Sequence, residues 1–261
     1  MKKSLLTIAL LFFTASICGA ADIQVVTEEW KPYNFTENGK VTGISTEVVK
    51  ITLEKAGLTY KIDVLPWARA LKKARNEANV LIYTIVRNKA REKQFKWIGP
   101  LFSTSSNDGD STMSLYRLKD RKDIVCKDLK AAAKYKVGVV RGNDLSSFTK
   151  AGFKEGKQLF PVAEEVTNIR KLFKGRIDLI SGSANYLQGH FDKIKDPGIS
   201  FDNIEPVCPI NASSASNSET IVCMAFGKST PDDMVEKVRA AFEAISAEGK
   251  IQPVLDKYAD K

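Results

Sequence analysis

Histidine and cysteine are scarce in this chain of 261 residues, which contains one histidine and four cysteines. The histidine, His190, follows Gly189 and is not part of any Cys/His cluster. Structural zinc sites need Cys and His at short, regular spacings, and a Ser or Cys nucleophile needs an adjacent base. Neither pattern is recognisable, so we expect no metal site, no cofactor and no hydrolase-type catalytic set.

Long apolar runs are also missing. The longest apolar stretch near the start, Leu5 to Phe13, is far shorter than the ~20 residues of a membrane-spanning helix. Lys2 and Lys3 precede it, and the small residues Cys18 to Ala21 follow it. This order is typical of a secretory leader. We therefore predict a cleaved signal peptide at residues 1–21 and an exported protein, rather than a transmembrane anchor.

Acidic residues are outnumbered, since the 40 Lys and Arg residues exceed the 31 Asp and Glu residues and give a formal net charge of +9. Such an excess favours anionic ligands or surfaces. The basic residues are nevertheless scattered among acids, and no basic run is interleaved with stacking aromatics. We therefore predict a soluble basic surface and no nucleic-acid partner. A hydrophobic content of 43% suits a globular protein of one or two domains.

Three cysteines remain once Cys18 leaves with the leader, and export makes disulfides possible. Cys208 and Cys223 flank a Ser/Asn-rich loop between two strand-like segments. This arrangement predicts a Cys208–Cys223 disulfide and leaves Cys126 as an odd thiol.

Strand-like and helix-like segments alternate along the mature chain. The first five are the strand Asp22–Thr27, a helix from Ser45 or Thr46 to Gly57, the strand Tyr60–Leu65, a helix opened by Pro66, and the strand Val80–Val86. This alternation predicts right-handed crossovers and a parallel sheet. It restarts at Tyr135 after a polar stretch, Ser103–Ser111, and the strand-like segment Thr220–Phe226 returns the chain to the first unit.

The sequence thus predicts an α/β protein of two lobes, each a mainly parallel sheet flanked by helices, joined by two hinge crossings. The first lobe is assigned to residues 22–104 and 226–261, and the second to residues 112–222. Two lobes joined in this way close like a hinged clamp.

Two arginines follow the most apolar strand. Arg87 and Arg91 come just after Val80–Val86, and Phe95 and Trp97 then return the chain to apolar packing. Ligands of open α/β sheets bind beyond the carboxyl ends of the strands. The pattern therefore predicts an anion clamp. A surface ion pair with Glu92 is the alternative for Arg91.

A set of short motifs follows in a fixed order along nearly the whole mature chain. They are Glu29–Phe35, Val41–Ile44, Leu65–Trp67, Arg91–Trp97 with Gly99–Pro100, Val137–Val139 with Gly142, and Gly249–Ile251 with Lys257–Tyr258. In the order and spacing of these motifs the chain resembles the bacterial extracellular solute-binding proteins of the polar amino-acid type, which are the soluble receptors of ABC importers. The resemblance implies a periplasmic-binding-protein type II fold. It also implies a monomeric periplasmic receptor with a small-molecule solute and a membrane permease as its partners.

The resemblance also implies a ligand set. Arg91 falls where the family keeps an arginine that forks onto the ligand carboxylate, a task that suits the rigid guanidinium. The other predicted ligand-binding residues are the first-lobe wall Trp30, Tyr33 and Trp67, the strand residue Thr84, the additional Arg87, the acid Glu29, and the second-lobe residues Gly142, Asn143, Asp144 and Gly182. For Trp67 plain core packing is the alternative, and for Asp144 a helix cap.

One departure from the family concerns the ligand's ammonium group. Amino-acid-binding members place an acid near Gly182, whereas Ser181–Asn185 contains no carboxylate. Burying an unpaired ammonium costs several kcal/mol, more than the roughly 1.5–3 kcal/mol that one charged hydrogen bond recovers. Either Glu29 or Glu28 supplies the counter-charge, or the ligand is not an ordinary α-amino acid. Thr84 and Val86, where the family tends to show Gly and Thr, loosen the ligand assignment further.

Three functions are compatible with these residues. The first is a periplasmic receptor that captures a small carboxylated solute for an ABC importer. The second is a dehydratase-like enzyme on the same fold, which would need a general acid or base and for which Glu29 is the only acid near the predicted cleft. The third is a ligand-sensing partner of a membrane receptor.

Overall fold

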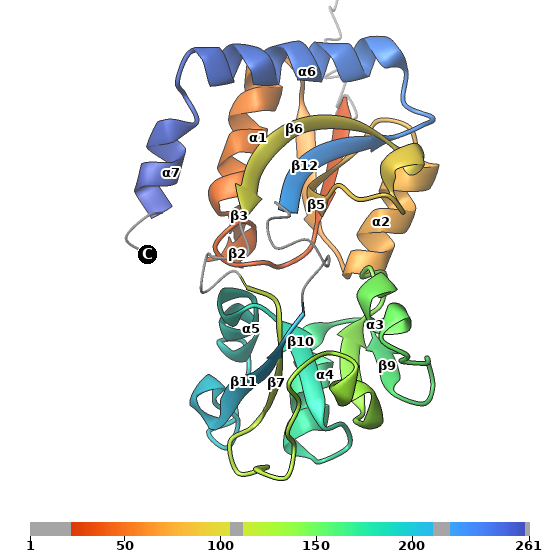
Figure 1. Ribbon diagram of the computed structural model, residues 1–261. Helices are drawn as coiled ribbons and strands as arrows, with labels where there is room; N and C mark the ends of the chain where they lie inside the picture. Colours follow the sequence, from red (N-terminus) through yellow and green to blue (C-terminus); the bar gives the residue numbers. More distant parts are fainter. Residues whose placement is uncertain (1–21, 105–111, 211–219, 259–261) are drawn as a thin grey trace, which may run out of the picture.

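Two lobes, each built on one sheet, make up the protein. The computed structural model describes residues 22–104, 112–210 and 220–258, and Figure 1 shows one lobe above the other. The predicted signal peptide lies outside the described residues, as does most of the predicted crossing at Ser103–Ser111 and the return segment 211–219. No helix in the described part of the chain is both long and apolar enough to cross a membrane.

The sheet of the first lobe contains five strands in the order β4-β1-β5-β12-β6. Their bounds are β1 Ile23–Thr27, β4 Tyr60–Val64, β5 Val80–Val86, β6 Phe95–Thr104 and β12 Thr220–Gly227. Strands β4, β1 and β5 are parallel, whereas β12 runs antiparallel to both β5 and β6. The central strand β5 is buried over its first six residues, which explains its continuous Val/Leu/Ile run. The carboxyl ends of the three parallel strands lie at one edge, toward the second lobe (Figure 1).

Helices cover both faces of this sheet. Helix α1 (Ile44–Lys55) and helix α6 (Asp232–Ala247) pack their apolar residues on one face, and helix α2 (Trp67–Asn76) packs on the other. Helix α7 (Gln252–Tyr258) lies beside α1 (Figure 1). The remaining elements of this lobe are the hairpin β2 Phe35–Glu37 and β3 Lys40–Thr42 and the 3-10 turn η1 Glu92–Gln94.

Helix α1 begins earlier than the sequence predicts. Gly43, with φ +111°, precedes the first turn, and neither Ser45 nor Thr46 caps the helix. Thr46 is buried, and its hydroxyl hydrogen-bonds the Tyr83 hydroxyl at 2.9 Å. Gly43 is required here because an added Cβ would lie 2.5 Å from the carbonyl oxygen of Tyr33.

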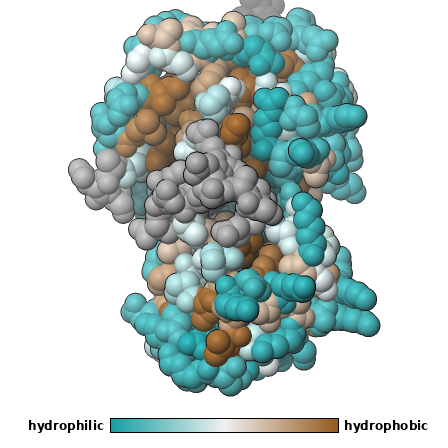
Figure 2. Space-filling view, viewed as in Figure 1, coloured by the Kyte–Doolittle hydropathy of each residue, from teal (hydrophilic) through white to brown (hydrophobic). Residues whose placement is uncertain are grey.

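The second lobe has its own five-stranded sheet in the order β11-β7-β10-β8-β9. Its elements are β7 Ser114–Leu118, η3 Ala131–Lys134, β8 Val137–Val140, α3 Ser146–Lys150, β9 Leu159–Val162, α4 Glu165–Phe173, β10 Leu179–Gly182, α5 Ala184–Phe191, η4 Phe201–Asn203 and β11 Ile204–Pro209. Strands β10, β8 and β9 are parallel, and β7 is antiparallel to β10 and β11. Both sheets are therefore mixed, with three parallel strands whose carboxyl ends face the other lobe. Figure 2 shows hydrophilic residues along the outer rims of both lobes and apolar residues nearer the middle.

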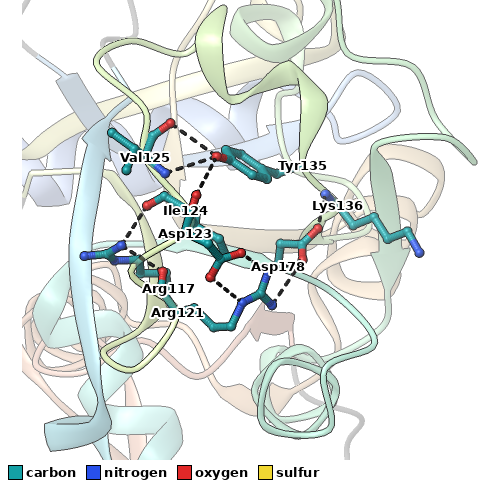
Figure 3. Close-up of polar contacts among 8 residues, drawn as sticks. All are labelled: Arg117, Arg121, Asp123, Ile124, Val125, Tyr135, Lys136 and Asp178. Carbon is teal, nitrogen blue, oxygen red and sulfur yellow. Dashed lines mark hydrogen bonds and ion pairs between the residues drawn. The ribbon is translucent and has the colours of Figure 1, made fainter.

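A polar network stabilises the end of the second lobe that faces away from the first (Figure 3). Arg121 binds the carboxylate of Asp123 with two hydrogen bonds of 2.9 Å and reaches Asp178 at 3.4 Å. Asp178 also accepts a hydrogen bond from the backbone N–H of Lys136. The network joins the loop after β7 to the amino ends of the parallel strands, so it holds the scaffold together rather than forming part of the inter-lobe cleft.

The boundary of the second lobe differs from the predicted one. Thr220 pairs with Thr104 and Ile221 pairs with Ser103, so all of β12 belongs to the first sheet. The sequence pattern predicts that the second lobe extends to residue 222. The antiparallel pairing of β12 with β6 begins at Thr220, so the residues from Thr220 onward belong to the first lobe.

The predicted Cys208–Cys223 disulfide was wrong. The three cysteines in the described part of the chain are free and buried. Cys208 lies in the core of the second lobe together with Cys126, whereas Cys223 lies in the core of the first lobe. The two flanking segments are strands of different sheets and not the two arms of one hairpin, so their cysteines do not meet.

Candidate functional site

Side chains of the two lobes meet between the two sets of strand ends. The side-chain contacts across this boundary include Asn88 to Asp144 at 2.9 Å, Lys193 to Glu29 at 3.0 Å and Lys31 to Asp192 at 3.3 Å. In Figure 1, α5 lies beneath the β2–β3 hairpin and α3 lies beneath α2. The lobes are thus in a closed arrangement.

Arg91 lies at this boundary and is only 8% exposed. Its Nη1 donates to the carbonyl of Val86 at 3.2 Å, and its Nη2 donates to the carbonyl of Gly142 on the other lobe at 3.1 Å. The guanidinium lies 5.3 Å from the centre of the Trp67 ring. Burial lowers the pKa of Arg91, and the negative charges of Asp144 and Glu28 oppose that effect. These two hydrogen bonds use two of the five guanidinium donors.

Arg87 is turned to the surface instead. Its Nε and Nη2 donate to the two carboxylate oxygens of Glu92 at 2.9 and 2.7 Å, and its guanidinium lies 5.7 Å from the centre of the Trp97 ring. The ion pair with Glu92 that was the alternative for Arg91 is therefore made by Arg87. Of the two arginines of the predicted clamp, Arg91 alone takes part in the contact between the lobes.

The predicted aromatic wall is partly assembled. The Trp30 ring packs edge to face against Tyr33 at 5.4 Å and against Tyr186 of the second lobe at 6.1 Å. Tyr33 stacks on Phe102 at 4.3 Å. Trp67, the first residue of α2, is buried in the core and also lies under Arg91. Trp30 therefore lies between the lobes, while Trp67 positions the arginine.

The loop after β8 supplies a second-lobe contact through two of its three predicted residues. Gly142, with φ +93°, offers its carbonyl to Arg91, and an added Cβ would lie 3.2 Å from the Cα of Ala68. One carboxylate oxygen of Asp144 accepts from the N–H of Ser146, the first residue of α3, whose N-cap position is held by Leu145, and the other oxygen accepts from Asn88 of the first lobe. Asn143 is exposed and donates its N–H to Val140 within the turn.

Gly182 and Thr84 lie in the sheets. A Cβ on Gly182 would lie 2.7 Å from Cγ of Leu187, so glycine allows α5 to pack against the end of β10. Thr84 has φ +55° and lies beside the register shift of β12 between Cys223 and Met224. This backbone conformation is strained for a β-branched residue. The buried Thr84 hydroxyl finds no hydrogen-bond partner among the described residues.

The two neighbouring acids after β1 differ in environment. Glu29 accepts hydrogen bonds from the N–H and the hydroxyl of Thr36 and pairs with Lys193. Burial acts to raise the pKa of Glu29, but these partners together lower it. For Glu28, burial raises the pKa to about 8, with the positive charge of Arg91 acting in opposition. Glu29 therefore helps to hold the lobes together, whereas the charge of Glu28, like that of Asp144, acts on Arg91.

Sequence reasoning missed the acid on the second lobe. Glu165 is the first residue of α4 and is 1% exposed. Its Oε2 accepts a hydrogen bond from Asn168 at 3.1 Å, while its Oε1 has no partner in the described chain. Burial raises the pKa of Glu165 well above its ordinary value. Its position in the sequence could have indicated it, because Glu165 follows the parallel strand β9, and ligands of open α/β sheets bind beyond the carboxyl ends of the strands.

A cavity of about 190 Å³ opens at the lobe boundary. Residues of both lobes line it, including Glu29, Lys31, Phe35, Tyr186, His190 and Lys193. Burial lowers the pKa of His190 to about 4, so the ring is neutral at physiological pH. Among the described residues, no cluster of three or more His, Cys, Asp and Glu could hold a metal ion.

The family model described as bacterial extracellular solute-binding proteins, family 3, matches residues 23–261. The chain belongs to this family. No curated protein sequence matches it. The two-lobed α/β architecture of this solute-binding protein is that of the family, and its inter-lobe contacts lie where the solute-binding cleft is expected.

Solved structures with the same fold include the arginine-, lysine-, histidine-binding protein ArtJ from Geobacillus stearothermophilus, with a TM-score of 0.70 and 16% identity over 92% of this chain and 95% of that one. An ancestral arginine-binding protein bound to arginine has a TM-score of 0.68 and 18% identity, covering 90% and 97%. A histidine kinase sensor domain has a TM-score of 0.71 and 16% identity, covering 90% and 95%. At these identities the neighbours establish the fold of this solute-binding protein.

Proposed function

We propose that this protein captures a small carboxylated solute, an amino acid or a related compound, between its lobes and presents it to the membrane permease of an ABC importer. The observation that carries the proposal is Arg91, a buried guanidinium that belongs to the first lobe and hydrogen-bonds the second. A guanidinium with donors remaining is suited to a bidentate bond with a carboxylate. Arg91 therefore couples ligand binding to lobe closure.

The names of the structural neighbours support the amino-acid class. ArtJ binds arginine, lysine and histidine according to its description, and another neighbour is the substrate-binding protein of an amino-acid ABC transporter. The leader at residues 1–21 supports a location in the periplasm after cleavage. The protein acts there as a monomer without a nucleic-acid partner, and the permease is its macromolecular partner.

Binding without chemical conversion is the function that the site favours. The dehydratase alternative relied on Glu29 as a general acid or base, and the carboxylate of Glu29 is occupied by Thr36 and Lys193. A sensing role shares the same binding step and differs only in the membrane partner, so the solute-binding test applies to both roles.

Isothermal titration calorimetry on unfolded, dialysed and refolded protein tests the proposal. We expect heat with one or more of the standard amino acids, and a loss of affinity of at least about tenfold in Arg91→Ala, because a charged hydrogen bond contributes roughly 1.5–3 kcal/mol. Arg69→Ala, an exposed arginine on α2, is the matched control and should bind as the wild type does. An absence of heat with amino acids, organic acids and small peptides would contradict the proposal.

A further inference from the structure

A surface groove of about 540 Å³ lies on the second lobe, and none of the residues that line it belongs to the predicted ligand set. Its walls come from helix α4 and from the segment that follows α5. The charged lining residues are Arg170 and Lys174 of α4 and Lys193, Lys195 and Asp196 of the following segment. The fold therefore gathers four cations and a single acid around one hollow, although the sequence distributes them over two separate segments.

Three of these cations have no counter-charge within the described chain. The side chains of Arg170, Lys174 and Lys195 are exposed and make no hydrogen bond or ion pair with any described residue. The carboxylate of Asp196 accepts instead from the N–H of Gly198 at 2.9 Å. Arg170 and Lys174 are four positions apart on one helix, a spacing at which like charges repel. The groove thus concentrates positive charge that an external anion would balance.

The fourth cation of the groove indicates which kind of anion fits. Lys193 binds the carboxylate of Glu29 at 3.0 Å, so this end of the groove already accepts a carboxylate side chain. Ile194, which is 9% exposed, and the half-buried Ile199 add apolar surface to the lining. A hollow with both kinds of surface fits an extended chain whose carboxylates flank an apolar side chain. A flat anionic membrane surface would reach only its rim.

We propose that this groove binds an acidic peptide segment of a protein partner. The proposal goes beyond solute capture and does not depend on which solute the cleft takes. Complementary charges of this kind steer the encounter of two proteins and fix their relative register. Because Lys193 contacts Glu29 of the first lobe, the groove ends at the lobe boundary, and the bound segment lies beside the contact that closure makes.

Fluorescence anisotropy with the refolded mature chain at pH 7 tests the proposal. The probe is a fluorescein-labelled peptide that repeats the unit Glu-Glu-Leu, and the comparison peptide has Gln in place of every Glu. We expect saturable binding of the acidic peptide at low ionic strength and none of the comparison peptide. Binding should weaken severalfold as the salt concentration rises to about 0.15 M, since exposed charges are then screened.

Two double variants locate the binding on the surface. Arg170→Glu/Lys174→Glu reverses two exposed charges of the groove and should weaken binding of the acidic peptide at least about tenfold. Lys150→Glu/Lys157→Glu is the matched control, because both lysines are exposed on the same lobe outside the groove and the net charge changes equally. The control should keep most of the wild-type affinity for the peptide. Thermal unfolding checks that both variants are folded, and both should bind the solute as the wild type does.

Several outcomes would overturn the proposal while leaving the solute-binding function standing. Equal losses of peptide affinity in the two double variants would mean that overall charge, rather than the groove, attracts the peptide. An absence of peptide binding at low ionic strength, or wild-type affinity in Arg170→Glu/Lys174→Glu, would also contradict it. Phosphatidylglycerol vesicles form the last arm: groove-dependent binding to vesicles that is tighter than binding to the peptide would assign the groove to a lipid surface instead.

Discussion

Arg91 of the first lobe and Gly142 of the second are joined by a hydrogen bond of 3.1 Å between a guanidinium N–H and a backbone carbonyl. Because the acceptor is a backbone atom, the contact needs no particular side chain at position 142 but does need space for close approach. Ala68 and Trp67 lie within 3.3 Å of the point where a Cβ would be. The bond therefore depends on glycine, and it links the proposed ligand-binding arginine to closure of the lobes.

Gly142→Ala should favour the open lobes and weaken solute binding. The left-handed backbone costs a non-glycine residue about 1–2 kcal/mol, and the added methyl also meets the first lobe. Gly152→Ala is the matched control, because Gly152 has φ +97° but no described atom within 4 Å of its Cβ position. Both variants should lose similar stability, whereas only Gly142→Ala should lose affinity in calorimetry. Equal affinities in the two variants would show that closure does not bring position 142 against α2.

Arg87→Ala should leave solute affinity unchanged within experimental error. Arg87 is exposed and is paired with Glu92 on the surface of the first lobe. Calorimetry with the same amino acids is the measurement, and Arg91→Ala is the comparison. A loss as large as that of Arg91→Ala would restore the two-arginine clamp that the sequence predicts.

The free energy of unfolding of the ligand-free protein should fall as pH rises from about 4.5 to about 8 through the contribution of Glu28. Burial raises the pKa of Glu28 from 4.5 to about 8, so the folded state holds a proton that the unfolded state has released across this range. Arg91, Glu165 and Tyr186 are the charged and titratable groups around it.

Urea unfolding of wild type and Glu28→Gln at several pH values isolates this contribution, because glutamine does not titrate. The wild type should lose stability relative to the variant as the pH rises. His190 contributes in the opposite direction at lower pH: its pKa is lowered to about 4, so its stabilising contribution is present at neutral pH and is lost as pH falls. A pH-independent difference between wild type and Glu28→Gln would mean that Glu28 is ionised and solvated in the closed protein.

Mild oxidation should join Cys126 to Cys208 and not Cys208 to Cys223. Cys126 and Cys208 lie in the same core of the second lobe, where their thiols donate to the carbonyls of Val207 and Pro209, whereas Cys223 is in the first lobe. With oxidised glutathione as the oxidant, each thiol loses a hydrogen as the disulfide forms, and the oxidant is reduced to two glutathione thiols. Peptide mapping by mass spectrometry identifies the pair. A cross-linked peptide that contains Cys208 and Cys223 would contradict the packing of the two cores.

The periodic segments of the fold were predictable from sequence because local patterns specify them. The apolar run Val80–Val86 is the central strand β5, and the helix opened by Pro66 is α2. Strand β7 and the β2–β3 hairpin were not predicted, because β7 gains its partners only from β10 and β11, which lie far along the chain. The sequence likewise did not reveal that Cys208 and Cys223 lie in different cores, because tertiary packing decides this.

For the site, the sequence by itself determined which family the chain resembles and that Arg91 follows a buried strand. Only the tertiary structure decided that Arg87 turns away to Glu92 and that Glu29 is occupied by Lys193. The physical reason is that strand periodicity and position in a motif are properties of neighbours in the chain. Charge pairing in a cleft depends instead on residues that are more than 100 positions apart, such as Glu29 and Lys193. Only closure of the two lobes brings such residues together.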